Sequence, residues 1–137
     1  MNKQRKATKI MLIRHAEKPA KDFAPFGVTR KGERDKESLA VRGWQRAGAL
    51  IGLFAPNGGK INSSLAKPQF LYASKPLRRR GSRRPSQTLI PLSEKLGIEI
   101  NTEVGTSPDQ VGLWGRNALS RKSRGLTCRC SLFGNDT

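Results

Sequence analysis

Short apolar runs alternate with segments of helical period over the first hundred residues of the chain. Residues 10–13, 69–73 and 98–100 are short and rich in β-branched or aromatic side chains, which is typical of strands. Residues 38–54 and 85–96 repeat apolar side chains at helical spacing, which indicates amphipathic helices. This order of strand, helix, strand, helix and strand predicts an α/β fold with a parallel or mostly parallel sheet and helices packed on its faces.

The ends of these segments carry further signals. The apolar run at residues 10–13 is continuous, which predicts a strand buried on both faces. Pro85 fits the first turn of the second helix, and Gly97 fits its C-terminal cap. Pro91 lies inside the same helical pattern, where it lacks a backbone donor and favours a kink.

No periodic pattern continues beyond Asn101. Apolar residues are scattered through residues 102–137, and no strand or helix is predicted there. We therefore divide the chain into a partial α/β domain at residues 1–103 and a tail of uncertain structure at residues 104–137. An incomplete sheet would expose an unpaired edge and an apolar face, which favours self-association.

The balance of charge is extreme, because 27 lysines and arginines stand against 10 aspartates and glutamates and give a net charge of +17. Such a charge predicts an anionic partner: a phosphate ester, a nucleic acid or an acidic membrane surface. The cations are densest at residues 75–84, but no aromatic side chains interleave with them to stack on nucleic acid bases. A solvated loop beside a phosphate pocket is therefore favoured over a nucleic-acid patch.

Several features favour a cytoplasmic protein that does not span a membrane. No segment approaches the roughly 20 apolar residues that a membrane span needs. The apolar run that follows the basic N-terminus, residues 10–13, is too short for a signal peptide. Cys128 and Cys130 are too close in sequence for an unstrained bridge and lack further metal ligands nearby, so we expect free thiols in a reducing compartment.

Arg14 and His15 follow the first predicted strand, where open α/β sheets place their ligand sites. A neutral imidazole at this position can attack phosphorus and form a phosphohistidine. A neighbouring guanidinium can bind two phosphate oxygens at once. A dipeptide of this kind, taken alone, is more often a solvated pair at a strand end.

Four segments in the same order resemble the histidine phosphatase superfamily, which has the phosphoglycerate mutase-like fold. Residues 10–17 (IMLIRHAE) resemble its opening strand, which ends in Arg-His-Gly, often with a following Glu. Residues 70–74 (FLYAS) resemble its next core strand, and residues 84–88 (RPSQT) resemble its Arg-Ala-x-Gln-Thr helix start. Residues 42–47 (RGWQRA) resemble the helix start between them. The resemblance covers about residues 8–102.

The resemblance implies a phosphoglycerate mutase-like, mostly parallel sheet that is incomplete at the C-terminus. It also implies phosphomonoester hydrolysis or phosphoryl transfer, with His15 as the nucleophile and Arg14 and Arg84 as clamps on the phosphoryl oxygens. The spacing from Ser74 selects Arg78 as the second arginine, whereas the spacing to Gln-Thr and the helix N-terminus favours Arg84. The expected partner is a small phosphorylated substrate or inorganic phosphate, and no metal or organic cofactor is implied.

The chain departs from the family pattern at several positions. Ala16 replaces the usual glycine, and Lys21 stands where many members have asparagine. Family members carry a second histidine in the last third of the chain, whereas His15 is the single histidine of this sequence. From Val104 onward the sequence resembles nothing in the family, as if the reading frame had shifted or the chain were truncated.

A general acid is needed to protonate the leaving oxygen, and Glu17 and Glu103 are the nearest candidates by position. Each is also consistent with an ordinary surface carboxylate. Two hypotheses follow, and whether the chain is an enzyme stays open between them. One is a histidine phosphatase weakened or inactivated by the missing histidine, and the other is a non-catalytic basic remnant that binds anions or nucleic acid.

Overall fold

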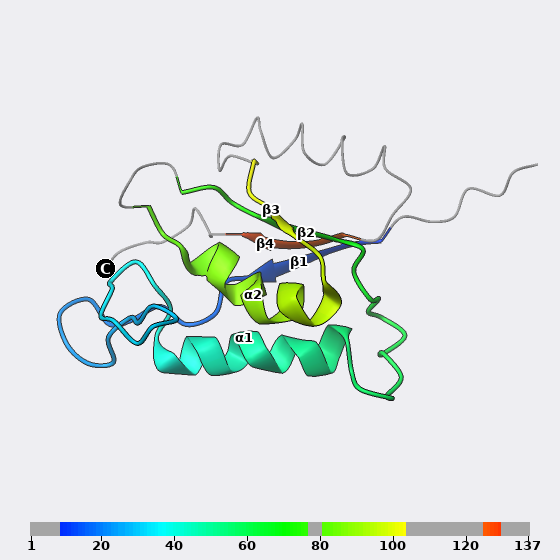
Figure 1. The fold of residues 1–137 in the computed structure, drawn as a ribbon, viewed down its shortest axis with the longest axis horizontal. Coiled ribbons are helices and arrows are strands. Elements are labelled where there is room, and N and C mark those ends of the chain that lie inside the picture. The colour runs from blue at the N-terminus through cyan, green and yellow to red at the C-terminus, as the bar shows by residue number, and fades with distance from the viewer. Residues whose placement is uncertain (1–8, 77–80, 104–124, 130–137) are drawn as a thin grey trace, which may run out of the picture.

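In a computed structural model, the described part of the chain comprises residues 9–76, 81–103 and, for the backbone alone, 125–129. Figure 1 shows its helices and strands. In chain order they are β1 (Ile10–Arg14), α1 (Val41–Phe54), β2 (Phe70–Ala73), α2 (Arg84–Leu96), β3 (Ile100–Asn101) and β4 (Gly125–Arg129).

The strands form one sheet in the order β1-β4-β2-β3, and every pair of neighbours is parallel. The prediction of a mixed α/β fold with a parallel sheet is therefore confirmed. Because the strands are parallel, their carboxyl ends meet at the same edge of the sheet. The Arg14-His15 pair lies at this edge, where β1 ends.

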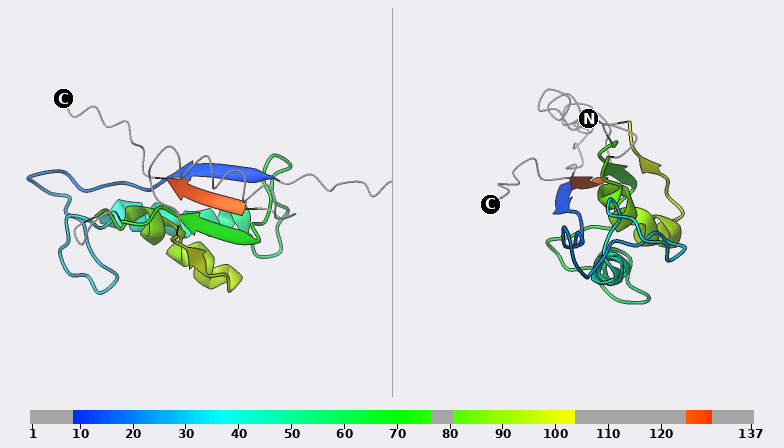
Figure 2. Two further views of the ribbon diagram at one scale, coloured as in Figure 1. Left: turned by 90° about the horizontal axis from the view of Figure 1, so that it is seen from above. Right: turned by 90° about the vertical axis from the view of Figure 1, so that its left-hand side faces the viewer.

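The central strand β4 was not predicted from the sequence. It lies between β1 and β2, as Figure 2 shows, and pairs with both along its length. Its sequence, Gly-Leu-Thr-Cys-Arg, has neither a continuous apolar run nor a longer alternation, so the pattern beyond Asn101 gave no strand signal. The sequence left residues 104–137 as a tail of uncertain structure; the structure places β4 within it, and the rest of that tail lies outside the described residues.

Both helices lie on the same side of the sheet and pack against each other (Figures 1 and 2). The core between them and the sheet contains Met11, Phe54, Leu71, Leu89 and Leu92. On β1, Met11 faces this core, but Leu12 keeps 64% of its surface exposed. The prediction that this strand is buried on both faces was wrong, since successive side chains of a strand point to opposite faces.

The first helix begins three residues later than the apolar period predicts, at Val41 instead of Ser38. Ser38 is buried, and its hydroxyl donates to Asp35 Oδ2 at 2.6 Å while it accepts a hydrogen bond from Gln87 Nε2 at 2.8 Å. These bonds hold Ser38 in the preceding loop. Local side-chain hydrogen bonding of this kind competes with helix formation.

The second helix runs from Arg84 through Pro91 to Leu96 as one element. Gly97 adopts the left-handed conformation, with φ of 65°, and its N–H donates to Ser93 O, so the predicted glycine cap is confirmed. Ile98 exchanges two hydrogen bonds with Ser93, one through its N–H and one through its carbonyl. Because Ile98 is bound to the helix end, β3 begins only at Ile100 instead of Ile98.

No helix within the described residues has both the length and the apolar character needed to cross a membrane.

Candidate functional site

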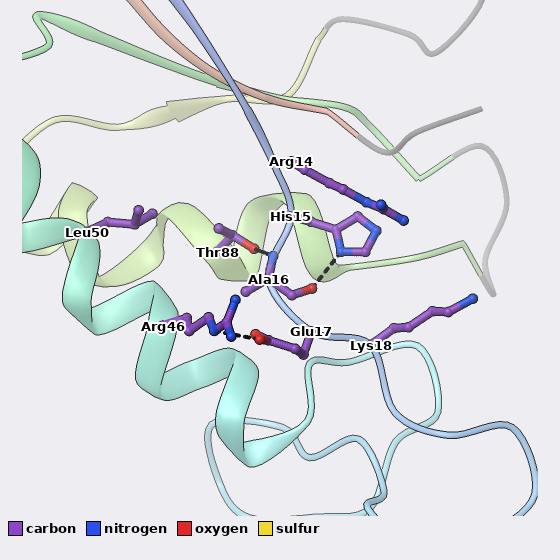
Figure 3. Close-up of a pocket in the computed structure, with 8 residues that line it drawn as sticks. All are labelled: Arg14, His15, Ala16, Glu17, Lys18, Arg46, Leu50 and Thr88. Carbon is purple, nitrogen blue, oxygen red and sulfur yellow. Dashed lines mark hydrogen bonds and ion pairs between the residues drawn. The ribbon is translucent and has the colours of Figure 1, made fainter. Parts of the chain in front are cut away.

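A cavity of about 520 Å³ opens where β1 ends (Figure 3). It lies between the turn after the strand and the two helices. Its lining consists of Arg14, His15, Ala16, Glu17 and Lys18 from the end of β1 and the following turn, Arg46 and Leu50 from α1, and Thr88 from α2. Three of the residues singled out from the sequence, namely Arg14, His15 and Glu17, therefore lie in one pocket.

The imidazole of His15 is oriented by the backbone beside it. Nδ1 lies 2.7 Å from Ala16 O, and a carbonyl oxygen can only accept, so Nδ1 carries the hydrogen of this bond. In the neutral ring, Nε2 then holds the free lone pair. The residue is half-buried, and its Nε2 is therefore the nitrogen available as a nucleophile or an acceptor.

Burial of the imidazole lowers the pKa of His15 below its ordinary value of 6.5. The hydrogen bond to Ala16 O opposes this shift, and the positive charges of Arg84, Arg14 and Lys18 reinforce it. The ring is therefore neutral at pH 7, which is the form that a nucleophile requires.

This shift predicts a loss of stability in weak acid. The unfolded chain takes up the histidine proton near pH 6.5, whereas the folded chain takes it up only at lower pH. The unfolded chain therefore binds the proton more tightly than the folded chain. Above pH 6.5 this difference has no effect on the free energy of unfolding, and below pH 6.5 it lowers that free energy. Denaturant unfolding at pH 7.5 and pH 5.5 measures this, and His15→Gln should show a smaller drop than the wild type. An equal drop in both proteins would assign the acid sensitivity to other groups.

Two cations lie beside the imidazole. In Figure 3 the side chains of Arg14 and Lys18 extend to the same side of the chain as the ring of His15. Both residues are exposed, so their charged ends are accessible to a ligand from solvent. This arrangement favours an oxyanion as the ligand. Its central atom would face the imidazole, and its oxygens would contact Arg14 and Lys18.

The turn that carries His15 is held from both helices. On one side Thr88 Oγ1 accepts a hydrogen bond of 2.9 Å from Ala16 N. On the other side Ala40 N donates to Glu17 O at 3.0 Å, and α1 approaches so closely at Gly43 that an added Cβ would lie 2.6 Å from Glu17 O. Thr88 and Gly43 belong to the family-like segments, whereas Ala40 does not, and no sequence pattern indicated that these residues hold the turn.

Glu17 lines the pocket and forms an ion pair with Arg46, with Oε1 2.6 Å from Nε. Within the described part of the chain, its second oxygen Oε2 is buried without a hydrogen-bond partner. The structure thus places Glu17 at the site, with one carboxylate oxygen bound to Arg46. Arg46 was not predicted as a site residue.

Arg84 lies at the start of α2 as expected, but its guanidinium is directed to the loop before α1. It donates to Lys36 O at 2.6 Å and to Ser38 O at 3.3 Å, and it lies 3.9 Å from Glu37 Oε2. Arg84 is not among the residues that line the cavity. Its charge nevertheless acts on His15, since it lowers the pKa of the imidazole more than the charge of Arg14 does.

The two remaining candidates are not brought to the site. Glu103 is exposed and follows β3. In the described sheet β3 is three strand spacings, or about 14 Å, away from β1, whose end forms the pocket. Its backbone N–H donates to Asn101 Oδ1 at 3.0 Å. Arg78 lies outside the described residues. Among the residues that the structure describes, no group of three or more histidine, cysteine or acidic side chains is arranged to hold a metal ion.

Neither a protein-family model nor a curated protein sequence matches this chain.

Proposed function

We propose that this chain is a histidine phosphatase-like protein that binds a phosphomonoester in the pocket at the end of β1. His15 Nε2 attacks phosphorus, the bond from phosphorus to the leaving oxygen breaks, and water then hydrolyses the phosphohistidine. The observation that carries the proposal is the hydrogen bond from His15 Nδ1 to Ala16 O, because it leaves Nε2 free in a neutral ring beside Arg14 and Lys18.

The proposal extends to a phosphoglycerate mutase-like fold that is incomplete at the C-terminus. It is supported by the positions of the family-like segments within a parallel sheet with packed helices. Residues 10–17 span β1 and the turn that carries His15, and residues 84–88 begin α2. Residues 42–47 lie in the first half of α1, beside that turn.

The two arginines have different parts in this proposal. Arg14 is exposed at the pocket and can bind phosphoryl oxygens directly. Arg84 keeps 15% of its side chain exposed and is bound to backbone carbonyls, so it contributes a fixed positive charge near His15. Both charges favour the dianionic phosphoryl group over a neutral ligand.

A non-catalytic role in anion binding is the second candidate. The net charge of +17 and the exposed cations of the pocket favour this role independently of any chemistry at His15. A protein of this kind would bind inorganic phosphate at Arg14 but would not turn over a phosphomonoester.

Arg14→Ala is expected to weaken binding of inorganic phosphate by about 1.5–3 kcal/mol, which is roughly 10- to 150-fold in Kd. The reason is the loss of a charged hydrogen-bond donor at the end of β1. Isothermal titration calorimetry at constant ionic strength measures the difference.

Arg30→Ala is the matched control for this experiment. It removes the same charge from an exposed arginine that pairs with Glu94 and does not line the pocket. The control should retain the wild-type affinity, apart from a small effect of net charge. Equal affinities in all three proteins would exclude Arg14 from the binding site.

A further inference from the structure

Thr88 is linked to His15 by two consecutive hydrogen bonds (Figure 3). Its Oγ1 accepts from Ala16 N at 2.9 Å, and the carbonyl of Ala16 accepts from His15 Nδ1 at 2.7 Å. Thr88 comes from α2 and is 72 residues away from Ala16 in the sequence. Its side chain is buried, with 2% exposure of the residue.

The direction of the Thr88 hydroxyl is fixed by its own helix. The hydroxyl hydrogen is donated to Arg84 O, one turn earlier, at 2.8 Å. The oxygen therefore faces Ala16 with a lone pair, which is what the N–H of Ala16 requires. A β-branched side chain in a helix has few rotamers, so the acceptor is held in one place.

The Ala16 backbone has few alternatives to this acceptor. Its N–H is partly buried, and a buried donor without a partner costs free energy, so loss of the Thr88 oxygen favours a rotation of the His15–Ala16 peptide. This rotation moves the Ala16 Cα, to which the next peptide with the Ala16 carbonyl is joined. A shift of Ala16 moves the carbonyl that holds the Nδ1 hydrogen of His15. The imidazole then loses its preference for the tautomer that leaves Nε2 unprotonated.

The other side of the turn would remain in place without Thr88. Ala40 N still donates to Glu17 O, and α1 still packs against Glu17 at Gly43. Removal of the Thr88 hydroxyl should therefore loosen the turn locally and leave the sheet and the helices folded.

We propose that Thr88 is a positioning residue for His15, which acts through the backbone of Ala16 to select the imidazole tautomer with a free Nε2. The proposal rests on the proposed function of His15 as the nucleophile. Thr88 itself need not touch the phosphoryl group.

The tautomer of His15 can be measured directly, because the full chain contains a single histidine. The imidazole nitrogen shifts of the ¹⁵N-histidine-labelled protein give the ratio of the Nδ1–H to the Nε2–H form at a pH where the ring is neutral. In Thr88→Val, which keeps the shape but has no acceptor, the ratio should fall by about two- to tenfold, the equivalent of one hydrogen bond. Thr88→Ser keeps the acceptor and should restore most of the wild-type ratio.

Two further variants keep the test decisive. Thr88→Ala removes the acceptor and has a higher helix propensity, so it replaces Thr88→Val if valine unfolds the protein. Ser93→Ala removes a hydroxyl hydrogen bond from the same helix, to Ile98 O, and Ser93 does not line the pocket. Ser93→Ala should lower the stability of the protein as the loss of any one hydroxyl hydrogen bond from α2 would. It should leave the ratio of the His15 tautomers at the wild-type value.

Two outcomes separate this proposal from the proposed function. An unchanged ratio in Thr88→Val and Thr88→Ala, in a protein that binds inorganic phosphate, would overturn the role of Thr88 and leave the proposed function intact. A shifted ratio in these variants, in a protein whose wild type binds no phosphate, would support the positioning role and overturn the proposed function.

Discussion

Turnover of p-nitrophenyl phosphate by the full chain is expected to be about 10²–10³-fold lower than that of a histidine phosphatase with two site histidines. One preorganised stabiliser of the phosphoryl oxygens is missing, since His15 is the single histidine of the chain. The nitrophenolate leaving group needs no protonation, so the measurement does not depend on a general acid such as Glu17. Steady-state release of nitrophenolate measures the rate.

His15→Ala should abolish the remaining turnover, because no other imidazole can take its place. Arg30→Ala, which alters a cation outside the pocket, should leave the rate at the wild-type value. A wild-type rate on the order of 1–10³ s⁻¹, which is typical of an enzyme, would contradict the prediction. It would mean that another side chain, such as an arginine, performs the role of the absent histidine.

Gly43→Ala is expected to destabilise the fold by about 1–3 kcal/mol, the cost of overpacking a filled site. An alanine Cβ would lie 2.6 Å from Glu17 O, 3.1 Å from Glu17 N and 3.1 Å from Leu39 Cβ. The nearest of these atoms is backbone, so the strain can be relieved only by moving the turn that carries His15. Denaturant unfolding measures the loss of stability, and phosphate titration measures the effect on the pocket.

The same helix provides matched controls of opposite sign. Gly48 and Gly52 lie in α1 with no atom within 4 Å of an added Cβ. Alanine at either position should stabilise the protein by about 0.5–1 kcal/mol, because it removes the conformational freedom that glycine has in the unfolded chain. If Gly43→Ala stabilised the protein as the controls do, the result would contradict the close contact between α1 and Glu17 O.

The parts of the fold that depend on local pattern were predictable. The apolar runs and helical repeats of the first hundred residues located β1, α1, β2 and α2 to within a few residues, and Gly97 marked the end of α2. Where the prediction failed, side-chain contacts that the apolar pattern does not contain determined the result. Ser38 fits the helical period, but its hydrogen bonds to nearby Asp35 and to Gln87 of α2 keep it out of α1.

The candidate site was predictable only where it is contiguous in sequence. Arg14, His15 and Glu17 follow one strand and were found together, whereas Arg46 and Thr88 join them from two helices. A sequence pattern does not state which way a helical side chain faces across a pocket. For the same reason the direction of the Arg84 guanidinium, toward the carbonyls of Lys36 and Ser38, could not be read from its position at the start of α2.

The place of β4 has a consequence for synthesis of the protein on the ribosome. In the described sheet β1 has β4 as its neighbour, and Ile10 pairs with Gly125, more than a hundred residues later. Pairings of such high contact order form slowly, since a long loop must close before they contribute any stability. A nascent chain therefore carries β1 with an unpaired edge until residues 125–129 have emerged. The contacts of α1 and α2 with the turn after β1 can form earlier, but β1 gains this strand partner only after residues 125–129 have been made.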